Sequence, residues 1–129
     1  MKLRFRPNSV RLRLSRPEVE TLAETGAVSE MISFGPDPEN QLMYAVETHD
    51  ADGLGFHYQG GSIVVYLPTP EVADWAESDR VGFTEVVDLG TGETLTLIVE
   101  KDFKCLTDRP GEDESDAYPH PEESHGHVC

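Results

Sequence analysis

The chain contains few cysteines, few basic residues and no long apolar runs. Two of its 129 residues are cysteine, Cys105 and Cys129, which is too few for a disulfide scaffold and favours reduced thiols. No apolar stretch approaches the roughly 18 residues that a membrane-spanning helix needs. No apolar segment follows the charged start of the chain as in a secretory signal peptide. These absences predict a cytoplasmic protein that does not bind membranes.

Basic side chains are unevenly placed. The chain has 25 acidic and 10 basic residues, a formal net charge of −15. Six of the basic residues and none of the acidic ones lie within residues 1–17. An acidic surface repels phosphate backbones, so nucleic acid is not an expected partner. The length and the 37% share of hydrophobic residues fit one folded domain.

Residues 1–49 and 54–102 align as two copies of one unit. When the sequence is aligned with itself, each residue of the first segment matches the residue 53 positions later, and no gap is needed. One matched pair is Val28 with Val81. A repeat of this length predicts that each copy forms the same group of helices and strands. We therefore expect one domain over residues 1–106, built from the two repeats.

Alternation of apolar and polar residues predicts two strands before a helix and two after it in each copy. At the start of the chain, Leu3 and Phe5 alternate with basic residues. Turns are expected at residues 7–9 and 60–62, the second of which, Gly-Gly-Ser, suits a tight hairpin. The strands that follow the helices are predicted near 28–34, 41–48, 82–88 and 94–101.

Local signals also mark the ends of the two helices. Ser15 and Glu18 have the spacing of a capping box, and Gly26 fits the position after the last helical turn. In the second copy, Thr69 is the expected N-cap and Pro70 the first helical residue. The apolar spacing predicts these buried residues on the two helices: Val19, Leu22, Ala23, Val72, Trp75 and Ala76.

The connections between the predicted elements are short, which favours antiparallel neighbours. The expected fold is therefore α+β, a duplicated ββαββ unit that forms an eight-stranded antiparallel sheet or barrel with two helices. Closure into a barrel would remove exposed sheet edges. Residues 107–129 are rich in acids and proline and predict an extended or disordered acidic tail.

A cluster of arginines is the first candidate site. If the apolar residues of the first two strands face the core, several arginines share the opposite face, and two glutamates in later strands are candidates for the same face by alternation. Clustered guanidinium groups bind phosphate or carboxylate in paired hydrogen bonds, so this face predicts binding of an anionic small molecule or an acidic peptide, the chain's own tail included. The alternative is a solvated face whose ion pairs contribute under about 1 kcal/mol each. The candidate residues are Arg4, Arg6, Arg11, Arg13, Glu47 and Glu100.

An eight-stranded antiparallel barrel of duplicated units resembles the triphosphate tunnel proteins, which include thiamine-triphosphatase and class IV adenylate cyclase. The resemblance implies a metal-dependent phosphohydrolase in which arginines bind phosphates and Glu47 and Glu100 hold a divalent metal. The N-terminal signature of that family is Glu-x-Glu-x-Lys, whereas this chain has Lys-Leu-Arg-Phe-Arg at residues 2–6. Because the metal-binding acids of the signature are missing, a non-enzymatic binding module is the leading hypothesis and the hydrolase is the alternative.

The end of the chain offers soft metal ligands. Zinc, nickel or copper could bind there, although the paired two-residue spacing of a structural zinc site is missing. Metal binding by this cluster is a further alternative function. The candidate ligands are Cys105, His120, His125, His127 and Cys129.

Two segments are similar to a family of small uncharacterised bacterial proteins. They are Asn8–Leu14 and the Glu-Lys-Asp-Phe-Lys-Cys-Leu stretch at 100–106, which is followed by Glu-Asp-Glu-Ser-Asp at 112–116. The resemblance implies a bacterial cytosolic protein and supplies no activity.

Overall fold

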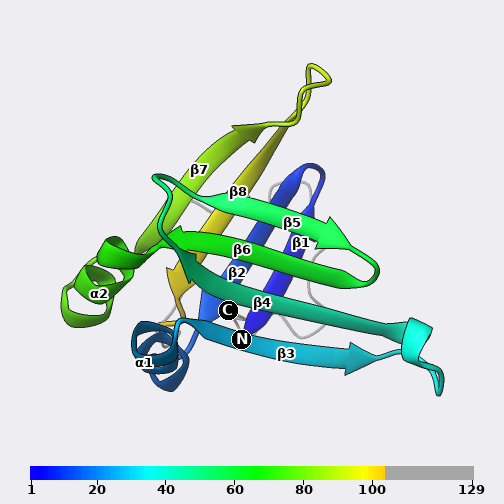
Figure 1. Cartoon of the computed structure of the whole chain (residues 1–129), viewed down its shortest axis with the longest axis horizontal. Coiled ribbons are helices and arrows are strands. Elements are labelled where there is room, and N and C mark those ends of the chain that lie inside the picture. Colours follow the sequence, from blue (N-terminus) through cyan, green and yellow to red (C-terminus); the bar gives the residue numbers. More distant parts are fainter. Residues whose placement is uncertain (104–129) are drawn as a thin grey trace, which may run out of the picture.

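The computed structural model describes residues 1–103, and this part of the chain folds into eight strands and two α-helices (Figure 1). The first half contains β1 (Lys2–Arg6), β2 (Ser9–Leu14), α1 (Arg16–Thr25), β3 (Ala27–Ser33), the short 3₁₀ helix η1 (Pro38–Asn40) and β4 (Gln41–His49). The second half contains β5 (Gly55–Gln59), β6 (Ser62–Pro68), α2 (Thr69–Glu77), β7 (Gly82–Asp88) and β8 (Thr94–Lys101). The number and order of these elements agree with the prediction.

The signals at the ends of α1 are confirmed. The Ser15 amide donates to the Glu18 carboxylate at 2.8 Å, and the Glu18 amide donates to the Ser15 hydroxyl at 3.4 Å. Gly26 ends the helix in the left-handed conformation, with φ of 87°. Ala23, however, is exposed, and the buried residues of this helix are Val19 and Leu22.

The predicted cap of α2 is wrong. The N-cap position is Pro68, and Thr69 is already the first helical residue. The Thr69 hydroxyl instead donates to the carbonyl oxygen of His49 at 2.9 Å. This bond ties the start of α2 to the end of β4, so the hydroxyl serves a tertiary contact in place of a local one.

The prediction of one antiparallel sheet or barrel is also wrong. The described strands form two separate four-stranded sheets, ordered β1-β2-β8-β7 and β3-β4-β6-β5. Each sheet is mixed, because β2 pairs with β8 and β4 pairs with β6 in parallel. The short connections make four hairpins antiparallel, β1–β2, β3–β4, β5–β6 and β7–β8, as predicted. The short link from β4 to β5, however, does not make these two strands neighbours, because β6 lies between them. The two central pairings decide the topology, and each joins a strand of the first half to a strand of the second.

Each helix carries the chain from one sheet to the other. β2 lies in the first sheet, and after α1 the chain enters β3 in the second. α2 leads back in the same way from β6 to β7. The two strands after α1 therefore share a sheet with β5 and β6 of the second half, and the two strands after α2 share a sheet with β1 and β2 of the first half. The two helices lie next to each other at the same end of the two sheets (Figure 1).

The two sheets have corresponding registers. Ser9 pairs with Thr96 in one sheet, and Ser62 pairs with Met43 in the other, so that both partners are displaced by the same 53 positions. Two hydrogen bonds follow the same correspondence: the Thr96 amide donates to the Asn8 carbonyl at 2.9 Å, and the Met43 amide donates to the Gly61 carbonyl at 2.8 Å.

The correspondence is not free of gaps, contrary to the sequence alignment. Val28 pairs with Val46, and the residue that pairs with Val99 at the equivalent point is Phe83, not Val81. The added length in the second half lies between α2 and β7, at residues 78–81. It is compensated in the following hairpin, where residues 89–93 replace the longer loop at 34–40 that contains η1.

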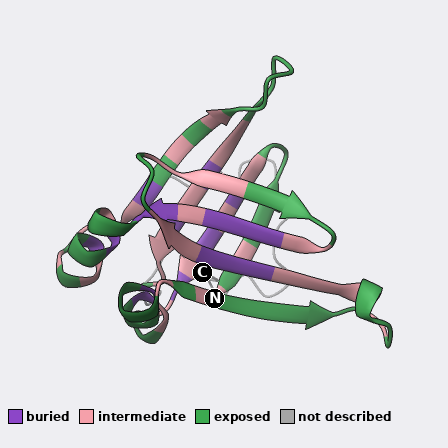
Figure 2. Cartoon of the chain, in the orientation of Figure 1, coloured by how far each residue is buried: buried purple, intermediate pink, exposed green. Residues whose placement is uncertain are grey.

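The core lies between the two sheets and under the helices (Figure 2). Alternate residues of β2 and β8 and the central residues of β4 and β6 are buried, and each helix contributes two buried side chains. Neither described helix has the length and apolar character needed to cross a membrane. The largest side chains that are almost fully buried are Trp75, Leu12, Leu14, Leu22, Leu67 and Leu97.

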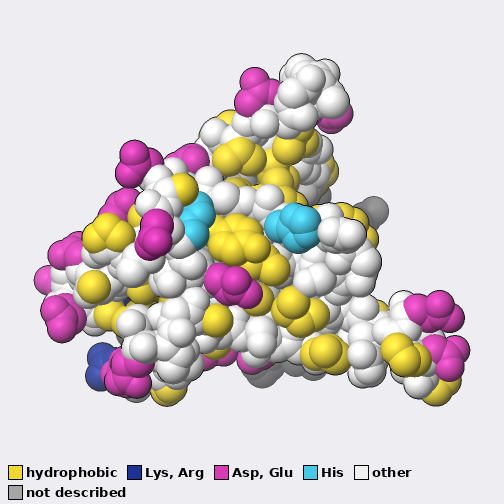
Figure 3. Space-filling view, in the orientation of Figure 1, with side chains coloured by type: hydrophobic (Ala, Val, Ile, Leu, Met, Phe, Trp, Pro, Cys, Tyr) yellow, Lys and Arg dark blue, Asp and Glu magenta, His cyan; other side chains and the backbone are white. Residues whose placement is uncertain are grey.

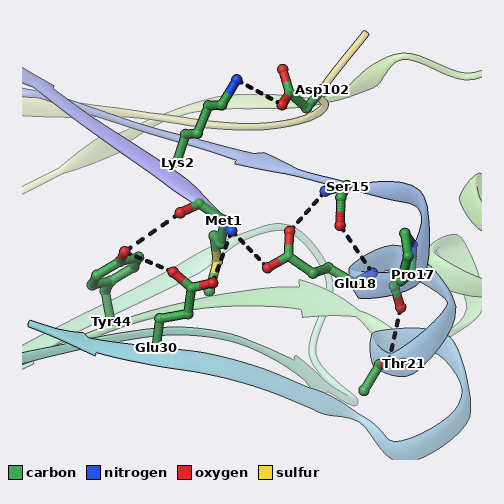
Figure 4. Close-up of polar contacts among 9 residues, drawn as sticks. All are labelled: Met1, Lys2, Ser15, Pro17, Glu18, Thr21, Glu30, Tyr44 and Asp102. Carbon is green, nitrogen blue, oxygen red and sulfur yellow. Dashed lines mark hydrogen bonds and ion pairs between the residues drawn. The ribbon is translucent and has the colours of Figure 1, made fainter. Parts of the chain in front are cut away.

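The first residue of the chain is held by two acids (Figure 4). The α-amino group of Met1 donates to Glu18 at 2.6 Å and to Glu30 at 3.0 Å. Glu30 also accepts from the Tyr44 hydroxyl at 2.9 Å. These contacts connect the start of β1 with α1, β3 and β4, and so they fix β1 at the edge of its sheet.

The second half contains a related contact. Glu85 on β7 accepts from the backbone amide of Leu54 at 3.2 Å, and Leu54 lies 53 positions after Met1. A carboxylate therefore holds the residue just before the first strand in both halves. In the first half the donor is an ammonium group, which forms a stronger, charge-assisted bond.

The amine contacts predict how stability depends on pH. Burial alone would lower the pKa of the Met1 amine, but the bonds to Glu18 and Glu30 outweigh burial and raise it above 8.0. Burial would raise the pKa of Glu18, but its bonds to the amine and to Ser15 outweigh burial and lower it below 4.5. The stabilisation by the amine is complete below pH 8.0 and is lost as pH rises through its raised pKa, whereas that by Glu18 is complete above pH 4.5 and is lost as pH falls.

Urea unfolding at a series of pH values measures this dependence. We expect Glu30→Gln to lose less stability than the wild type as pH rises above 8.0, because this variant lacks one of the two carboxylates that hold the amine. Glu24→Gln, an exposed position on α1, is the control and should keep the wild-type profile. Identical profiles for Glu30→Gln and the wild type would contradict the assignment.

Candidate anion-binding face

One face of the β1-β2-β8-β7 sheet carries a cluster of basic side chains. Val10, Leu12 and Leu14 of β2 are buried, so the residues between them point to the outside of the sheet. The same alternation on β1 places its basic residues outward, since Leu3 packs against the core. We call this cluster the basic face, and it consists of Lys2, Arg4, Arg6, Arg11 and Arg13. The predicted grouping of four arginines on one wall agrees with this register, and Lys2 joins them.

Like charges lie directly opposite each other on this face. In the antiparallel β1–β2 pair, Arg4 is opposite Arg11 and Lys2 is opposite Arg13. Directly opposed like charges destabilise a sheet by a few tenths to about 1 kcal/mol per pair. A solvated face evolved for stability alone would alternate the signs of its charges. The basic face therefore has a composition that an anion would stabilise.

Two acids partly compensate the cluster. Glu100 on the neighbouring β8 accepts from the Arg13 side chain at 2.9 Å and lies 3.7 Å from Nε of Arg11. Asp102, just beyond β8, pairs with Lys2 at 2.9 Å (Figure 4). Both acids lie at the same end of the face as Lys2 and Arg13. The predicted membership of Glu100 thus agrees with the geometry, and its observed contacts are ion pairs with arginines.

The opposite end of the face is less compensated. Arg4 and Arg6 are exposed, and neither forms an ion pair with another residue of the described chain. Nε of Arg11 is shielded from solvent and has no hydrogen-bond partner among residues 1–103. An unpartnered buried donor on a charged group costs free energy. Arg4 and Arg6 are therefore available to an anion here, whereas Arg11 beside them is half-buried and lies near Glu100.

The predicted membership of Glu47 is wrong. Glu47 lies on β4 in the other sheet, where it is paired with Ala27 and Tyr66. The error lies in the sheet to which β4 was assigned. β4 belongs to the β3-β4-β6-β5 sheet, whereas the arginines lie on the β1-β2-β8-β7 sheet. Because Glu47 and Glu100 lie in different sheets, the two acids that the tunnel-type hydrolase would use for its metal are not on a common face.

The other sheet has a different surface. β3, β4, β5 and β6 contain no lysine or arginine. Figure 3 views the molecule from the side of this sheet and shows acidic, histidine and apolar side chains, with basic groups almost absent. His49 stacks on Tyr66 with the ring centres 5.6 Å apart. The basic cluster on one sheet thus contrasts with the remainder of an acidic protein.

The structure does not describe the predicted metal ligands of the tail. Cys105, His120, His125, His127 and Cys129 all lie outside residues 1–103, as do the predicted acidic tail and the last residues of the predicted domain. Among residues 1–103, no group of three or more His, Cys, Asp or Glu side chains is arranged to hold a metal ion.

Almost the whole chain matches the model of one protein family. Residues 1–122 match the model described as a family of unknown function, DUF7009. The chain belongs to the DUF7009 family. Comparisons with curated proteins and with solved structures gave no match. The function of this DUF7009 chain must therefore be argued from its own surface chemistry.

Sequence reasoning missed three features of the site. Lys2 belongs to the cluster as well, and its alternation with Arg4 and Arg6 is a sequence signal that predicts this position. Asp102 could not be found, because its contact with Lys2 depends on β8 lying beside β2. The opposition of Arg4 and Arg11 follows from the two-residue turn at Pro7 and Asn8, which fixes the hairpin register.

Proposed function

We propose that the basic face is a non-enzymatic binding surface for an anionic ligand, and that an acidic peptide in extended conformation is the ligand that fits it best. The observation that carries the proposal is the direct opposition of Arg4 and Arg11, at the end of the face where Arg4 and Arg6 form no ion pair within the described chain. An arrangement that is unfavourable in the free protein becomes favourable when carboxylates lie between the guanidinium groups.

The geometry of the face favours a peptide over a small enclosed anion. The basic residues of β1, Lys2, Arg4 and Arg6, are exposed on the outer side of the sheet, and Arg11 and Arg13 of β2 are half-buried beside them. Along β1 they recur at every second residue, which corresponds to a spacing of about 7 Å in a strand. Carboxylates at alternate positions of an extended peptide have the same spacing. Such a peptide could therefore place one carboxylate near each basic residue of β1.

Titration with hexaglutamate, monitored by calorimetry, tests the proposal. The double variant Arg4→Gln, Arg6→Gln should bind the peptide about tenfold more weakly or worse, because two charge-assisted contacts are lost. Affinity for the wild type should also fall as salt concentration rises, since exposed charges are screened. Arg16→Gln, an exposed arginine of α1 away from this face, is the matched control and should bind as the wild type does. Equal affinity of the double variant and the wild type would contradict the proposal.

The same double variant has an expected effect on stability with an unusual sign. Loss of the charge at Arg4 removes its repulsion from Arg11, so the free energy of unfolding without ligand should rise by about 0.2–1 kcal/mol. Most substitutions in a folded protein lower it. Urea unfolding measures the difference in chains that also carry Glu112→Gln, Glu114→Gln and Asp116→Asn, so that acids of the chain itself do not compensate the arginines. Arg16→Gln is the control, and a loss of stability in the double variant would indicate that Arg4 and Arg6 have a structural role.

A cytoplasmic location is part of the proposal. It is supported by the low cysteine content of the chain.

A further inference from the structure

The described chain ends beside the basic face. β8 ends at Lys101, and the amide of the next residue, Asp102, donates to the carbonyl oxygen of Leu14 at the end of β2. The Asp102 carboxylate pairs with Lys2, which belongs to the basic face (Figure 4). The chain therefore leaves the sheet with an acidic residue already bound to the cluster. The rest of the sequence continues from the border of this face.

The remaining residues have the opposite charge to the face. Residues 104–129 contain two basic residues, Lys104 and Arg109. Within this segment, acids occupy every second position at 112, 114 and 116, as basic residues do at 2, 4 and 6. Two extended segments with the same period can bring one carboxylate to each basic group. The acids of the segment are Asp108, Glu112, Asp113, Glu114, Asp116, Glu122 and Glu123.

We propose that the segment 104–129 binds the basic face of its own chain, with Glu112, Glu114 and Asp116 facing the basic residues of β1 and β2. This inference rests on the proposed function, because it uses the same surface. It adds a regulation: the segment competes with any acidic ligand supplied by another protein. An external ligand then binds only when the segment is displaced.

The length of chain is sufficient for this arrangement. Nine residues, 103–111, separate Asp102 from Glu112 and can span up to about 30 Å when extended. The five residues of β1 cover only about 17 Å. A short tether also keeps the segment at an effective concentration on the order of millimolar near the face. Weak individual ion pairs are therefore enough to keep the face occupied for much of the time.

Paramagnetic NMR on the full chain tests the proposal directly. Cys105 and Cys129 are replaced by serine, and Ser115→Cys provides a single site for a nitroxide label between two of the proposed contact residues. We expect the label to broaden the amide signals of β1 and β2 at low salt and to leave those of β3 and β5, in the other sheet, much less affected. The broadening should fall several-fold in about 0.5 M salt, where the Debye length is only a few ångströms.

Two matched variants decide whether the proposed contacts are specific. Glu112→Gln, Glu114→Gln, Asp116→Asn should remove most of the broadening. Asp108→Asn, Glu122→Gln, Glu123→Gln changes the charge by the same amount and should retain it. Broadening that is equal on both sheets, or equal in the two variants, would overturn the inference.

Hexaglutamate titration separates this inference from the proposed function. If the segment competes, the first triple variant should bind hexaglutamate about tenfold more tightly than the wild type. If neither protein binds the peptide but the label broadens β1 and β2 as expected, the segment is the ligand of the face and binding of an external partner is refuted. If both bind the peptide equally and the label shows no preference, the face binds external acids and self-binding is refuted.

Discussion

Replacement of Trp75 by alanine is expected to lower the free energy of unfolding by about 3–5 kcal/mol. Trp75 is fully buried on α2, and its ring packs edge to face against Phe83 with centres 5.2 Å apart. Its indole nitrogen donates to the carbonyl oxygen of Val81 at 3.1 Å. A loss of this size is a large part of the 5–15 kcal/mol that stabilises a typical domain. Urea unfolding monitored by circular dichroism would show it as a lower transition midpoint.

Two further variants separate volume from hydrogen bonding. Trp75→Phe keeps an aromatic ring beside Phe83 but loses the indole donor. The Val81 carbonyl also accepts from the Lys101 amide at 2.9 Å, so it keeps a partner. We therefore expect Trp75→Phe to cost less than half as much as Trp75→Ala. Equal losses would mean that the indole hydrogen bond, and not the packing, supplies the stability.

Trp75 also explains a difference between the two halves. The residue 53 positions earlier is Leu22, which is equally buried on α1. The larger indole occupies the half that has extra residues between helix and strand, at 78–81. Arg80 in this connection lies over the Phe83 ring at 4.0 Å and pairs with Glu71 of α2. The extra loop and the large side chain thus form one packed unit, which has no counterpart at the end of α1.

Local signals allowed most elements to be predicted from the sequence. The capping box of Ser15 and the terminating Gly26 depend on residues close together in the chain, and so does the two-residue period of each strand. Even the displaced pair Val28 and Phe83 falls inside strands that were placed correctly. The basic face was predictable for the same reason, because all its residues lie in one hairpin.

The arrangement of the sheets could not be predicted in this way. Parallel pairing of β2 with β8 joins residues more than 80 positions apart, and no local feature of either strand specifies it. The sequence alignment of Val28 with Val81 concealed the two compensating changes in length. Alternation along β4 indicates that Glu47 points away from the Val46 side, but it does not tell in which sheet β4 lies. The prediction for Glu47 is wrong because β4 pairs with β6 and not with the strands of the basic face. That the two halves arose by duplication stays a prediction, although their corresponding registers are those that a duplication would produce.

Replacement of Gly82 by alanine is expected to lower the free energy of unfolding by about 2–3 kcal/mol, by a different mechanism. Gly82 is the first residue of β7 and pairs with Glu100 of β8. A methyl group at this position would collide with the carbonyl oxygen of Val99 and would lie 2.7 Å from Cα of Glu100. Backbone atoms cannot rotate away as a side chain can, so β7 and β8 must separate locally.

This collision should also weaken ligand binding, which distinguishes it from the loss at Trp75. Glu100 holds Arg13 and approaches Arg11, so a shift of β8 would change the positions of two basic groups. We expect Gly82→Ala to lower both the free energy of unfolding and the affinity for hexaglutamate, whereas Trp75→Phe should lower stability alone. Gly55→Ala is the matched control, because a methyl group there meets its neighbours at 3.4–3.5 Å, which is an ordinary contact distance. If Gly82→Ala and Gly55→Ala behave alike, the close approach of β7 and β8 at Glu100 is not the feature that positions the arginines.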